Sequence, residues 1–520
     1  MISARNVKNT SYVILGLGRS GLSAAAALRA GGAKILCLDD NTNNLKIAED
    51  LGFTCTVPNK VIWNKIDVLL VSPGVPHHYP KPHNVVAAAI ENGVAIDNDI
   101  GLFFRSIGSS DWAKFESIPK IIAVTGSNGK STTSALIHHI LVCENRPSQL
   151  AGNIGKGVFD LEPLTNGETV ILELSSYQTE VANSLTPDIA VFTNFTPDHL
   201  ERHGGIGGYY AAKKRLFISG CPDRSVIGVD EFEGELLAQE IADHLHDDRV
   251  IRVSGSRRIS NLGWSVFANK GFLSEYRRGK QIASLDLRKC NSLKGSHNHQ
   301  NACAAYAAVR TLGIGPSSVE KALKSFTGLE HRSQLVTKIS GVAFVNDSKA
   351  TNVDSAMKAL ETFSKVRWIC GGEQKEEDIS RLNSALTNVE KAYVIGINAV
   401  ATTDRVVKVN DAADERLFVT STGEVGIKTT VSLPGISIQA SSAIASIFSV
   451  GIGVTILGSA VDLSTAGVTT SRFVIMPKMN NSGRNSLQNV VSGAVIYNTQ
   501  TNTLQFYNGS GWRNVTSTAV

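Results

Sequence analysis

A glycine-rich turn carrying a lysine and hydroxyl side chains is the strongest chemical feature of this 520-residue sequence. Residues 121–133 read IIAVTGSNGKSTT, an apolar strand that runs into a turn and then a helix. Glycines let backbone N–H groups converge on phosphate, Lys130 supplies positive charge, and Ser131 can reach Mg²⁺. Val124 stands where a strict P-loop has glycine, so this loop is shorter. We predict a nucleotide phosphate site here, with a purely structural turn as the alternative.

A second glycine-rich turn, GLGRSG at residues 16–21, also follows an apolar strand and opens a helix. Such turns let the backbone approach a pyrophosphate at a helix N-terminus. Asp39 follows the next strand at about the distance expected of a ribose-binding carboxylate. The motif predicts a dinucleotide or another nucleotide, and a tight turn that needs glycine is the alternative.

Other polar residues stand at places where they could complete such a site. Glu173 ends an apolar strand in LELSSYQ, where a carboxylate is a cap, an ion-pair partner or a Mg²⁺ ligand. His199 lies in TPDH and Lys213 in YAAKKR, and their simpler interpretations are a structural histidine and a solvated basic face. NDSKATN, residues 346–352, follows a further strand, at the kind of edge where α/β sheets bind ligands.

An α/β architecture is needed to bring these residues together. Apolar strands such as YVILG and KILCL alternate with helical stretches, which predicts doubly wound parallel sheets. The length predicts several domains. We place their boundaries at residues 1–115, 116–327, 328–400 and 401–520.

The last of these segments has a different composition. Between residues 417 and 520 only seven residues are charged, and the segment is rich in Ser, Thr, Gly, Val and Asn. Short alternating runs, such as GAVIYNTQTNTLQFYNGSGW, are separated by turn pairs. This pattern predicts a β-rich tail. It resembles the repeat-type β segments of phage tail-fibre proteins.

The composition of the chain limits which binding partners and which cellular compartment we expect for it. The net charge of +5 is small and no Lys/Arg block occurs, which disfavours a nucleic-acid surface. The sequence contains no apolar run of about 18 residues, the length that a membrane-spanning helix needs. Seven scattered cysteines without a CxxC pair indicate reduced thiols. We expect a cytoplasmic protein with neither nucleic acid nor membrane insertion.

The motifs in their order resemble the Mur ligases, the ATP-dependent amide-forming enzymes of peptidoglycan synthesis. The resemblance covers residues 8–398 and adds GNIG, HNHQN and FTGLEHR to the motifs above. It implies a three-domain α/β fold: a Rossmann-like N-terminal domain, a central P-loop-type ATPase domain and an incomplete Rossmann-like C-terminal domain, with the β-rich tail attached. It implies addition of D-glutamate to UDP-N-acetylmuramoyl-L-alanine through an acyl phosphate, by a monomer.

The resemblance also implies a role for each polar residue. ATP would contact Gly126, Ser127, Asn128, Gly129, Lys130, Ser131, Thr132, Asn301, Arg332 and Asp347. The UDP substrate and D-glutamate would contact Ser20, Asp39, Ser72, Asn153, His199, Lys349, Thr351 and Lys375. Two Mg²⁺ ions would be held by Ser131, Glu173, His199 and a carbamylated Lys213. The catalytic residues would be Lys130, His199 and Lys213.

The sequence departs from the family in three places. Gly101 stands where glutamate is usual, and Asp40–Asn41 stands where Thr-Arg is usual. The family's Ser-Pro-Ala-x-Ala-Ser segment and its final helix have no counterpart after residue 400. The alternative function is therefore a catalytically impaired nucleotide-binding fusion protein with a β adhesion or assembly tail. A nicotinamide oxidoreductase is disfavoured because only GxGxxG supports it.

Overall fold

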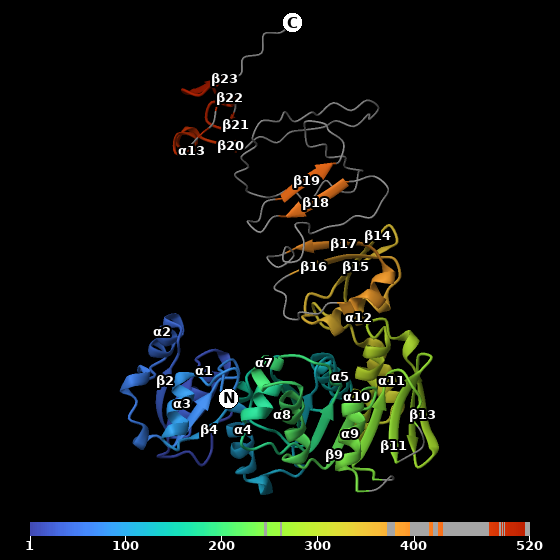
Figure 1. Ribbon diagram of the computed structural model, residues 1–520. Coiled ribbons are helices and arrows are strands. Elements are labelled where there is room, and N and C mark those ends of the chain that lie inside the picture. The colour runs from blue at the N-terminus through green and yellow to red at the C-terminus, as the bar shows by residue number, and fades with distance from the viewer. Residues whose placement is uncertain are drawn as a thin grey trace. The chain divides into compact units, whose positions relative to one another are not determined.

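A computed structural model describes residues 1–243, 247–259, 263–371, 380–395, 415–419, 425–429, 478–487, 490, 492 and 494–514. The chain divides into two compact units, residues 1–409 with 419–425 and residues 410–418 with 426–520. The first unit contains two large sheets covered by helices (Figure 1). These sheets confirm the predicted α/β class.

The first sheet is parallel, with the strand order β2-β1-β3-β4. Its strands are β1 (Ser11–Leu15), β2 (Lys34–Leu38), β3 (Val68–Val71) and β4 (Ala95–Asp97), and its helices are α1 (Arg19–Ala30), α2 (Thr42–Asp50), α3 (Asn84–Glu91) and α4 (Asp99–Gly108). Successive residues of β1 enter two different core clusters, because both faces of the sheet are covered by helices. This is the Rossmann-like arrangement that the sequence predicts.

The second sheet has nine strands in the order β13-β12-β11-β10-β9-β8-β5-β7-β6. They are β5 (Lys120–Thr125), β6 (Ser148–Gly152), β7 (Thr169–Glu173), β8 (Ile189–Phe192), β9 (Arg224–Gly228), β10 (Val250–Ser254), β11 (Trp264–Asn269), β12 (Phe272–Arg277) and β13 (Lys280–Asp286). The strands from β6 to β11 are parallel, and β12 and β13 extend the sheet antiparallel. The carboxyl ends of β5, β7 and β8 therefore meet at one edge.

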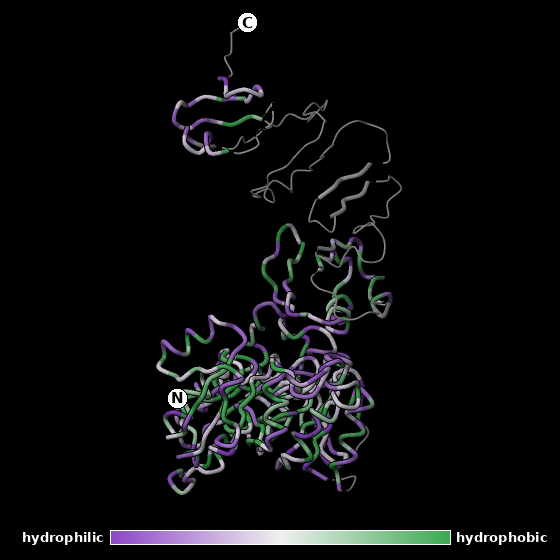
Figure 2. The backbone as a smooth tube through the Cα atoms, turned by 60° about the vertical axis from the view of Figure 1, so that its left-hand side comes forward, coloured by the Kyte–Doolittle hydropathy of each residue, from purple (hydrophilic) through white to green (hydrophobic). Residues whose placement is uncertain are grey.

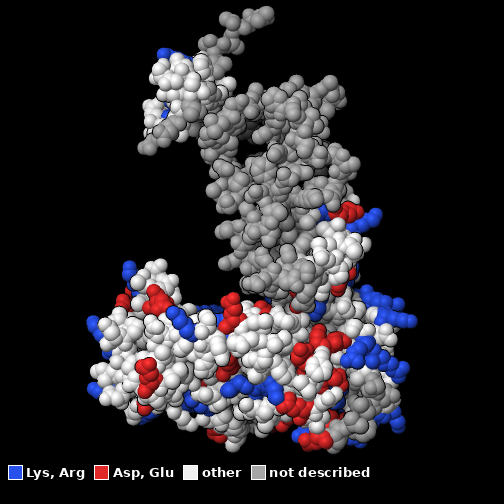
Figure 3. All heavy atoms as spheres, viewed as in Figure 1, with Lys and Arg blue, Asp and Glu red and all other residues white. Residues whose placement is uncertain are grey.

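Helices cover both faces of the second sheet. They are α5 (Lys130–Cys143), α6 (Ser176–Val181), α7 (Leu200–His203), α8 (Ile206–Ile218), α9 (Phe232–Ile241), α10 (Ser296–Thr311) and α11 (Pro316–Ser325). Hydropathy along the backbone shows apolar stretches concentrated in the packed sheets (Figure 2). No helix in the described part of the chain is long and apolar enough to cross a membrane. Basic and acidic side chains are interspersed on the visible face of the first unit (Figure 3).

Residues 328–395 form smaller pieces of structure. Strands β14 (Gln334–Ile339) and β15 (Val342–Asn346) make an antiparallel hairpin, and β16 (Val366–Gly371) pairs in parallel with β17 (Val389–Ile395). Helix α12 (Val353–Thr362) contributes to a small core with Leu382 and Ala385. The hairpin leaves large apolar side chains at least half exposed: Leu335, Val336, Ile339, Val342 and Phe344.

The described part of the tail is β-rich, as predicted. Strand β18 (Glu415–Val419) lies beside β19 (Val425–Thr429), and a four-stranded sheet has the order β20-β21-β22-β23. The strands of that sheet are β20 (Lys478–Met479), β21 (Val495–Asn498), β22 (Thr503–Tyr507) and β23 (Trp512–Asn514). The prediction for residues 430–477 falls outside the described residues.

Helix α4 explains the departure at Gly101. Asn98 caps this helix by accepting a hydrogen bond from the Gly101 N–H at 2.9 Å. A Cβ atom at position 101 would lie 1.9 Å from Asp97 Oδ1. Asp97 also accepts from the Asn183 N–H at 3.0 Å and pairs with Arg105 at 2.9 Å. Any larger residue at this position would displace the buried Asp97 carboxylate.

Asp99, the first residue of α4, provides a test of this packing. Burial raises its pKa to about 6, above the unfolded value of about 3.9. The ionised carboxylate therefore destabilises the fold increasingly from about pH 4 to pH 6, and fully above that range. We expect Asp99→Asn to raise the free energy of unfolding at pH 8 by at most about 3 kcal/mol, since one pKa unit corresponds to about 1.4 kcal/mol.

Denaturant unfolding of both forms at pH 4 and pH 8 measures this effect. The difference between the two proteins should be small at pH 4, where the carboxyl group is protonated in the folded state and still about half protonated in the unfolded state. A stability difference that does not change with pH would contradict the assignment.

Candidate active site

The phosphate loop connects β5, which lies between β8 and β7 in the second sheet, to α5. Gly129 caps α5 in the left-handed region, with φ of +81°, and a Cβ atom there would lie 2.1 Å from Asn301 Oδ1. The first N–H groups of a helix lack intrahelical partners, so the start of α5 offers donors to an anion. Glycine is required at position 129 both by its backbone angle and by the approach of Asn301.

Two lysine side chains converge on one carbonyl oxygen of this loop. Lys130 Nζ donates to Gly126 O at 2.9 Å and to Ser127 O at 2.7 Å. Lys213 Nζ, from α8, donates to the same Gly126 O at 2.7 Å. The Lys213 ammonium also lies 4.5 Å from the centre of the Tyr209 ring. The interpretation of Lys213 as part of a solvated face is wrong, because its side chain is only 1% exposed.

Burial lowers the pKa of both lysines. The pKa of Lys213 falls well below its ordinary value, first because of burial and then because of the nearby Lys130 charge. For Lys130, burial lowers the pKa, while Glu173 and Asp198 oppose this effect. The site therefore favours an incoming anion and a neutral amine on Lys213.

Glu173, at the end of β7, has one carboxylate oxygen that accepts no hydrogen bond in the described part of the chain. It is 2% exposed, and its Oε1 accepts from Asn153 Nδ2 at 3.3 Å. Its Oε2 is buried and accepts no hydrogen bond within the described part of the chain. A buried carboxylate oxygen without a donor fits a hard cation such as Mg²⁺. The nearby Ser131 Oγ accepts a hydrogen bond from Arg332 at 2.9 Å.

Within the described ranges no three His, Cys, Asp or Glu side chains converge as a metal site. Only two of the predicted metal ligands Ser131, Glu173, His199 and Lys213 are of these types, so their assignment as ligands stays a prediction. A cation at Glu173 would take further oxygen ligands from elsewhere, as Mg²⁺ does when it binds phosphates.

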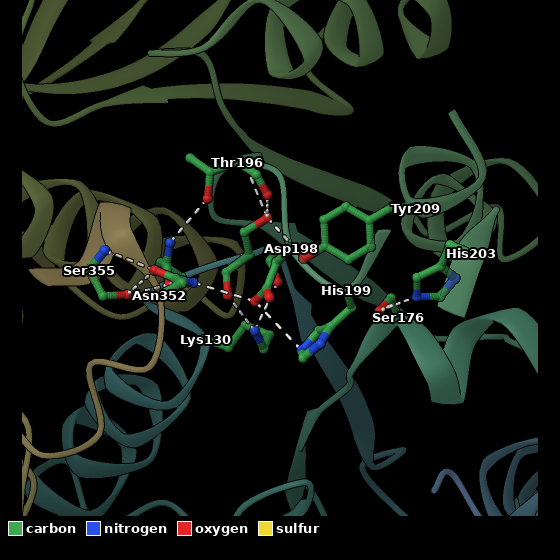
Figure 4. Close-up of polar contacts among 12 residues, drawn as sticks. Lys130, Ser176, Thr196, Asp198, His199, His203, Tyr209, Asn352 and Ser355 are labelled. Carbon is green, nitrogen blue, oxygen red and sulfur yellow. Dashed lines mark hydrogen bonds and ion pairs between the residues drawn. The ribbon is translucent and has the colours of Figure 1, made fainter. Parts of the chain in front are cut away.

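His199 and Asp198 lie beside the loop (Figure 4). His199 has a φ of 53° and caps α7, and its Nε2 lies 3.5 Å from Asp198 Oδ2. Its ring centre is 5.1 Å from that of Tyr177. Asp198 also accepts from Asn352 Nδ2 at 3.4 Å, and Asn352 and Ser355 donate to Asn128 Oδ1 at 3.3 and 2.7 Å. Helix α12 thus supplies polar groups to the loop.

A pocket opens beside the loop. The predicted site residues that line it are Asn128, Gly129, Thr132, Asn301, Arg332, Asp347 and Lys349. Asp347 Oδ1 accepts from the Ser333 N–H at 2.8 Å, and burial raises the pKa of Asp347. His297 also lines the pocket, and burial lowers its pKa to about 4.

The N-terminal residues Ser20, Asp39 and Ser72 lie around the first glycine-rich turn. Ser72 Oγ donates to Gly16 O at 2.7 Å. Both Asp39 oxygens accept from neighbouring groups: the Leu17 N–H at 2.5 Å, the Asn41 N–H at 2.7 Å and Asn44 Nδ2 at 3.1 Å. Asp39 therefore holds the turn. The unusual Asp40 pairs with His83 at 3.2 Å.

The remaining predicted residues are not gathered into the pocket. Thr351 is exposed and does not line it, and Lys375 lies outside the described residues. Sequence reasoning missed Asn194, Asp198 and Ser355. Asp198 precedes His199 in TPDH and Asn194 ends the segment DIAVFTN, so their places at strand ends were the available signals.

Comparison with known proteins gives a consistent result. Residues 124–309 match the Mur ligase middle domain, and residues 451–520 match a phage tail like trimerisation region. The UDP-N-acetylmuramoylalanine–D-glutamate ligase of Ruegeria pomeroyi is 59% identical over 400 residues, which is 77% of this chain and 86% of the relative. The corresponding ligase of Roseobacter denitrificans is 59% identical over 402 residues, 77% of this chain and 87% of the relative.

Among solved structures, the UDP-N-acetylmuramate–alanine ligase of Thermotoga maritima aligns with 74% of this chain and 85% of its own, with 20% identity and a TM-score of 0.46. The sequence identity to the two relatives from Ruegeria and Roseobacter, over most of the length of each chain, shows the protein family. The chain belongs to the Mur ligase family. Its two relatives above carry the name of the D-glutamate-adding branch of that family.

Gly129→Ala tests the geometry of the loop. We expect this change to lower the free energy of unfolding by about 1–3 kcal/mol through backbone strain, and to displace Asn301. Gly207→Ala is the matched control, because Gly207 lies in helix α8 with no neighbouring atom within 4 Å of an added Cβ. The control should raise stability by about 0.5–1 kcal/mol. Equal effects of both changes in denaturant unfolding would contradict the assigned conformation.

Proposed function

We propose that the chain is an ATP-dependent ligase that adds D-glutamate to UDP-N-acetylmuramoyl-L-alanine in cytoplasmic peptidoglycan precursor synthesis. The observation that carries the proposal is the phosphate loop, where Lys130 and Lys213 share Gly126 O beside a buried Glu173 oxygen without a donor. The names of the two relatives support the choice of substrates.

The proposed reaction has two steps. A carboxylate oxygen of the substrate attacks the γ-phosphorus of ATP, a P–O bond forms, and ADP leaves. The amine of D-glutamate then attacks the acyl carbon, a C–N bond forms, phosphate leaves and the amine loses a proton. No covalent enzyme nucleophile is required, so positioning and charge neutralisation supply the catalysis.

Residues of this chain have assigned roles in the proposal. Lys130 and the N–H groups at the start of α5 hold the β- and γ-phosphates. Asn301, Arg332 and Asp347 take the nucleoside side of ATP in the pocket that they line. Ser131 and Glu173 hold Mg²⁺, which neutralises phosphate charge when bound. His199 and Asn153 face the muramoyl-alanine substrate, and a second Mg²⁺ near His199 belongs to the same proposal.

A carbamylated Lys213 is part of the proposal. Burial lowers the pKa of Lys213 well below its ordinary value and so favours the neutral amine, which can attack CO₂. In that step an N–C bond forms and one proton is released, so that the neutral amine becomes an anionic carbamate. The carbamate would offer oxygen ligands for Mg²⁺ at this buried position.

The amino-acid side of the site is less complete. Lys349, Thr351 and Lys375 are the proposed D-glutamate contacts, and Lys349 lines the same pocket as Asp347. Ser20, Asp39 and Ser72 remain the proposed UDP contacts, although the Asp39 carboxylate already accepts from its own turn. A catalytically impaired nucleotide-binding fusion protein is the alternative function. That alternative rests on the departure from the family after residue 400.

Product formation from the three substrates tests the proposed function. We expect phosphate release to require UDP-N-acetylmuramoyl-L-alanine and ATP, and amide product to require D-glutamate as well. Phosphate release without amide product would support the impaired alternative. An absence of nucleotide binding in calorimetry would contradict both functions.

Lys213→Ala and Lys214→Ala form a matched pair for the catalytic assignment. Lys213 is buried beneath the loop, whereas Lys214 pairs with Glu240 at the surface. We expect Lys213→Ala to lower kcat by at least about 100-fold, within the range for loss of one electrostatic group. Lys214→Ala should stay within about twofold of the parent. A ¹³C signal from labelled bicarbonate that appears in the parent and in Lys214→Ala, but not in Lys213→Ala, would support the carbamate.

The tail suggests a second candidate function, assembly into trimers. The match of residues 451–520 with a phage tail like trimerisation region is the observation that favours it. The ligase portion itself is proposed to be monomeric, with association running through the tail. Sedimentation velocity of the full chain should give three times the chain mass. A single species at one chain mass, across micromolar concentrations, would contradict tail assembly and support a monomer.

A further inference from the structure

A chain of buried side-chain hydrogen bonds leads from Asp230 to the phosphate loop. Asp230 follows β9, and its Oδ2 accepts from Gln300 Nε2 at 2.9 Å. Gln300 Oε1 accepts from Asn194 Nδ2 at 3.3 Å. Asn194 Oδ1 in turn accepts from the Asn128 N–H at 2.8 Å. Gln300 and Asn194 are 3% and 2% exposed, so solvent does not compete for these bonds.

The Asp230 carboxylate determines the direction of every bond in this chain. It accepts from three further donors: Ser254 Oγ at 2.5 Å, the Gly255 N–H at 2.8 Å and Ser256 Oγ at 3.0 Å. A carboxylate only accepts, so the NH₂ group of Gln300 must face it. The Gln300 oxygen then faces Asn194, and the Asn194 oxygen is left to face the loop. Reversal of either amide would set two donors or two acceptors against each other.

The surrounding backbone leaves space for this arrangement. A Cβ atom at Gly255 would lie 2.7 Å from Gln300 Cβ, and one at Gly228 would lie 3.0 Å from Gln300 Nε2. Gly228 ends β9, the neighbour of β8, and Gly255 follows β10, the neighbour of β9, so the Gln300 side chain passes close to the backbone at both strand ends. The Gln300 side chain is therefore confined to one path between α10 and the loop.

Asn194 accepts two hydrogen bonds from the first half of the loop. Its backbone oxygen accepts from the Ser127 N–H at 2.9 Å, and its side chain accepts from the Asn128 N–H. Two loop N–H groups are thereby directed into the protein. The N–H groups that remain for a phosphate are those at Gly129 and the start of α5.

We propose that Asp230, Gln300 and Asn194 form a positioning relay that fixes which N–H groups of the phosphate loop face the nucleotide. These residues act through the loop and are not themselves catalytic. The nucleotide part of this inference rests on the proposed function, whereas the effect on the loop does not.

Asp230→Asn and Gln300→Met test the relay. The first keeps the shape but lets an amide face Gln300, so the direction of the bonds is no longer determined. The second keeps the length but removes both hydrogen bonds. Hydrogen exchange of the peptide covering residues 121–133, in the absence of nucleotide, should become at least about tenfold faster in both variants. The KM for ATP should rise about tenfold, with kcat and the KM for D-glutamate within about threefold of the parent.

Ser256→Ala is the matched control, because it removes one hydrogen bond to Asp230 without touching Gln300. It should leave both the exchange of peptide 121–133 and the KM for ATP unchanged. Faster exchange spread evenly over all peptides of the second sheet would overturn the relay, because it would indicate a merely structural role. Unchanged exchange in both variants would overturn it as well. Faster loop exchange in a protein that does not bind ATP would uphold the relay and reject only the proposed function.

Discussion

The confinement of two lysine side chains against one carbonyl oxygen, Gly126 O, is the interaction on which the site depends. Like charges so close together in a buried place are unfavourable, and water cannot screen them. The protein offsets this cost with the carboxylates of Glu173 and Asp198 at neighbouring strand ends. What remains is a site that an anion completes. A triphosphate supplies that charge, and a carbamate on Lys213 would remove one of the two cations.

The parallel sheet makes this concentration of charge possible. Strand β5 carries the loop at its end, β7 ends at Glu173, and Asn194 follows β8, and both β7 and β8 are neighbours of β5. The relay from Asp230 extends the same edge by one more strand, so that four successive strand ends determine the loop's conformation. Rigid strands are better suited to this task than loops alone, because small displacements of donors weaken phosphate binding strongly.

Local patterns predicted the sheets and the phosphate loop, because both follow from strand periodicity and glycine spacing within a few residues. The relay could not be predicted in this way, since Asp230 and Gln300 are 70 residues apart and Asn194 and Gln300 are 106 apart. For Asp39 the local pattern was clear, but it predicted a ligand contact for a carboxylate that hydrogen-bonds within its own turn. Its position predicted a ribose contact, yet the nearest donors are in its own turn. Lys213 and Lys214 are adjacent in sequence, and only the direction of α8 decides which one is buried.

The hairpin of β14 and β15 shows large apolar side chains to solvent, among them Leu335 and Val336, which are both 60% exposed. Exposed strands of this kind are what molecular chaperones and proteases use to distinguish unfinished chains from finished ones. An exposed apolar hairpin of this kind is a surface through which a chain can aggregate or be recognised by a protease.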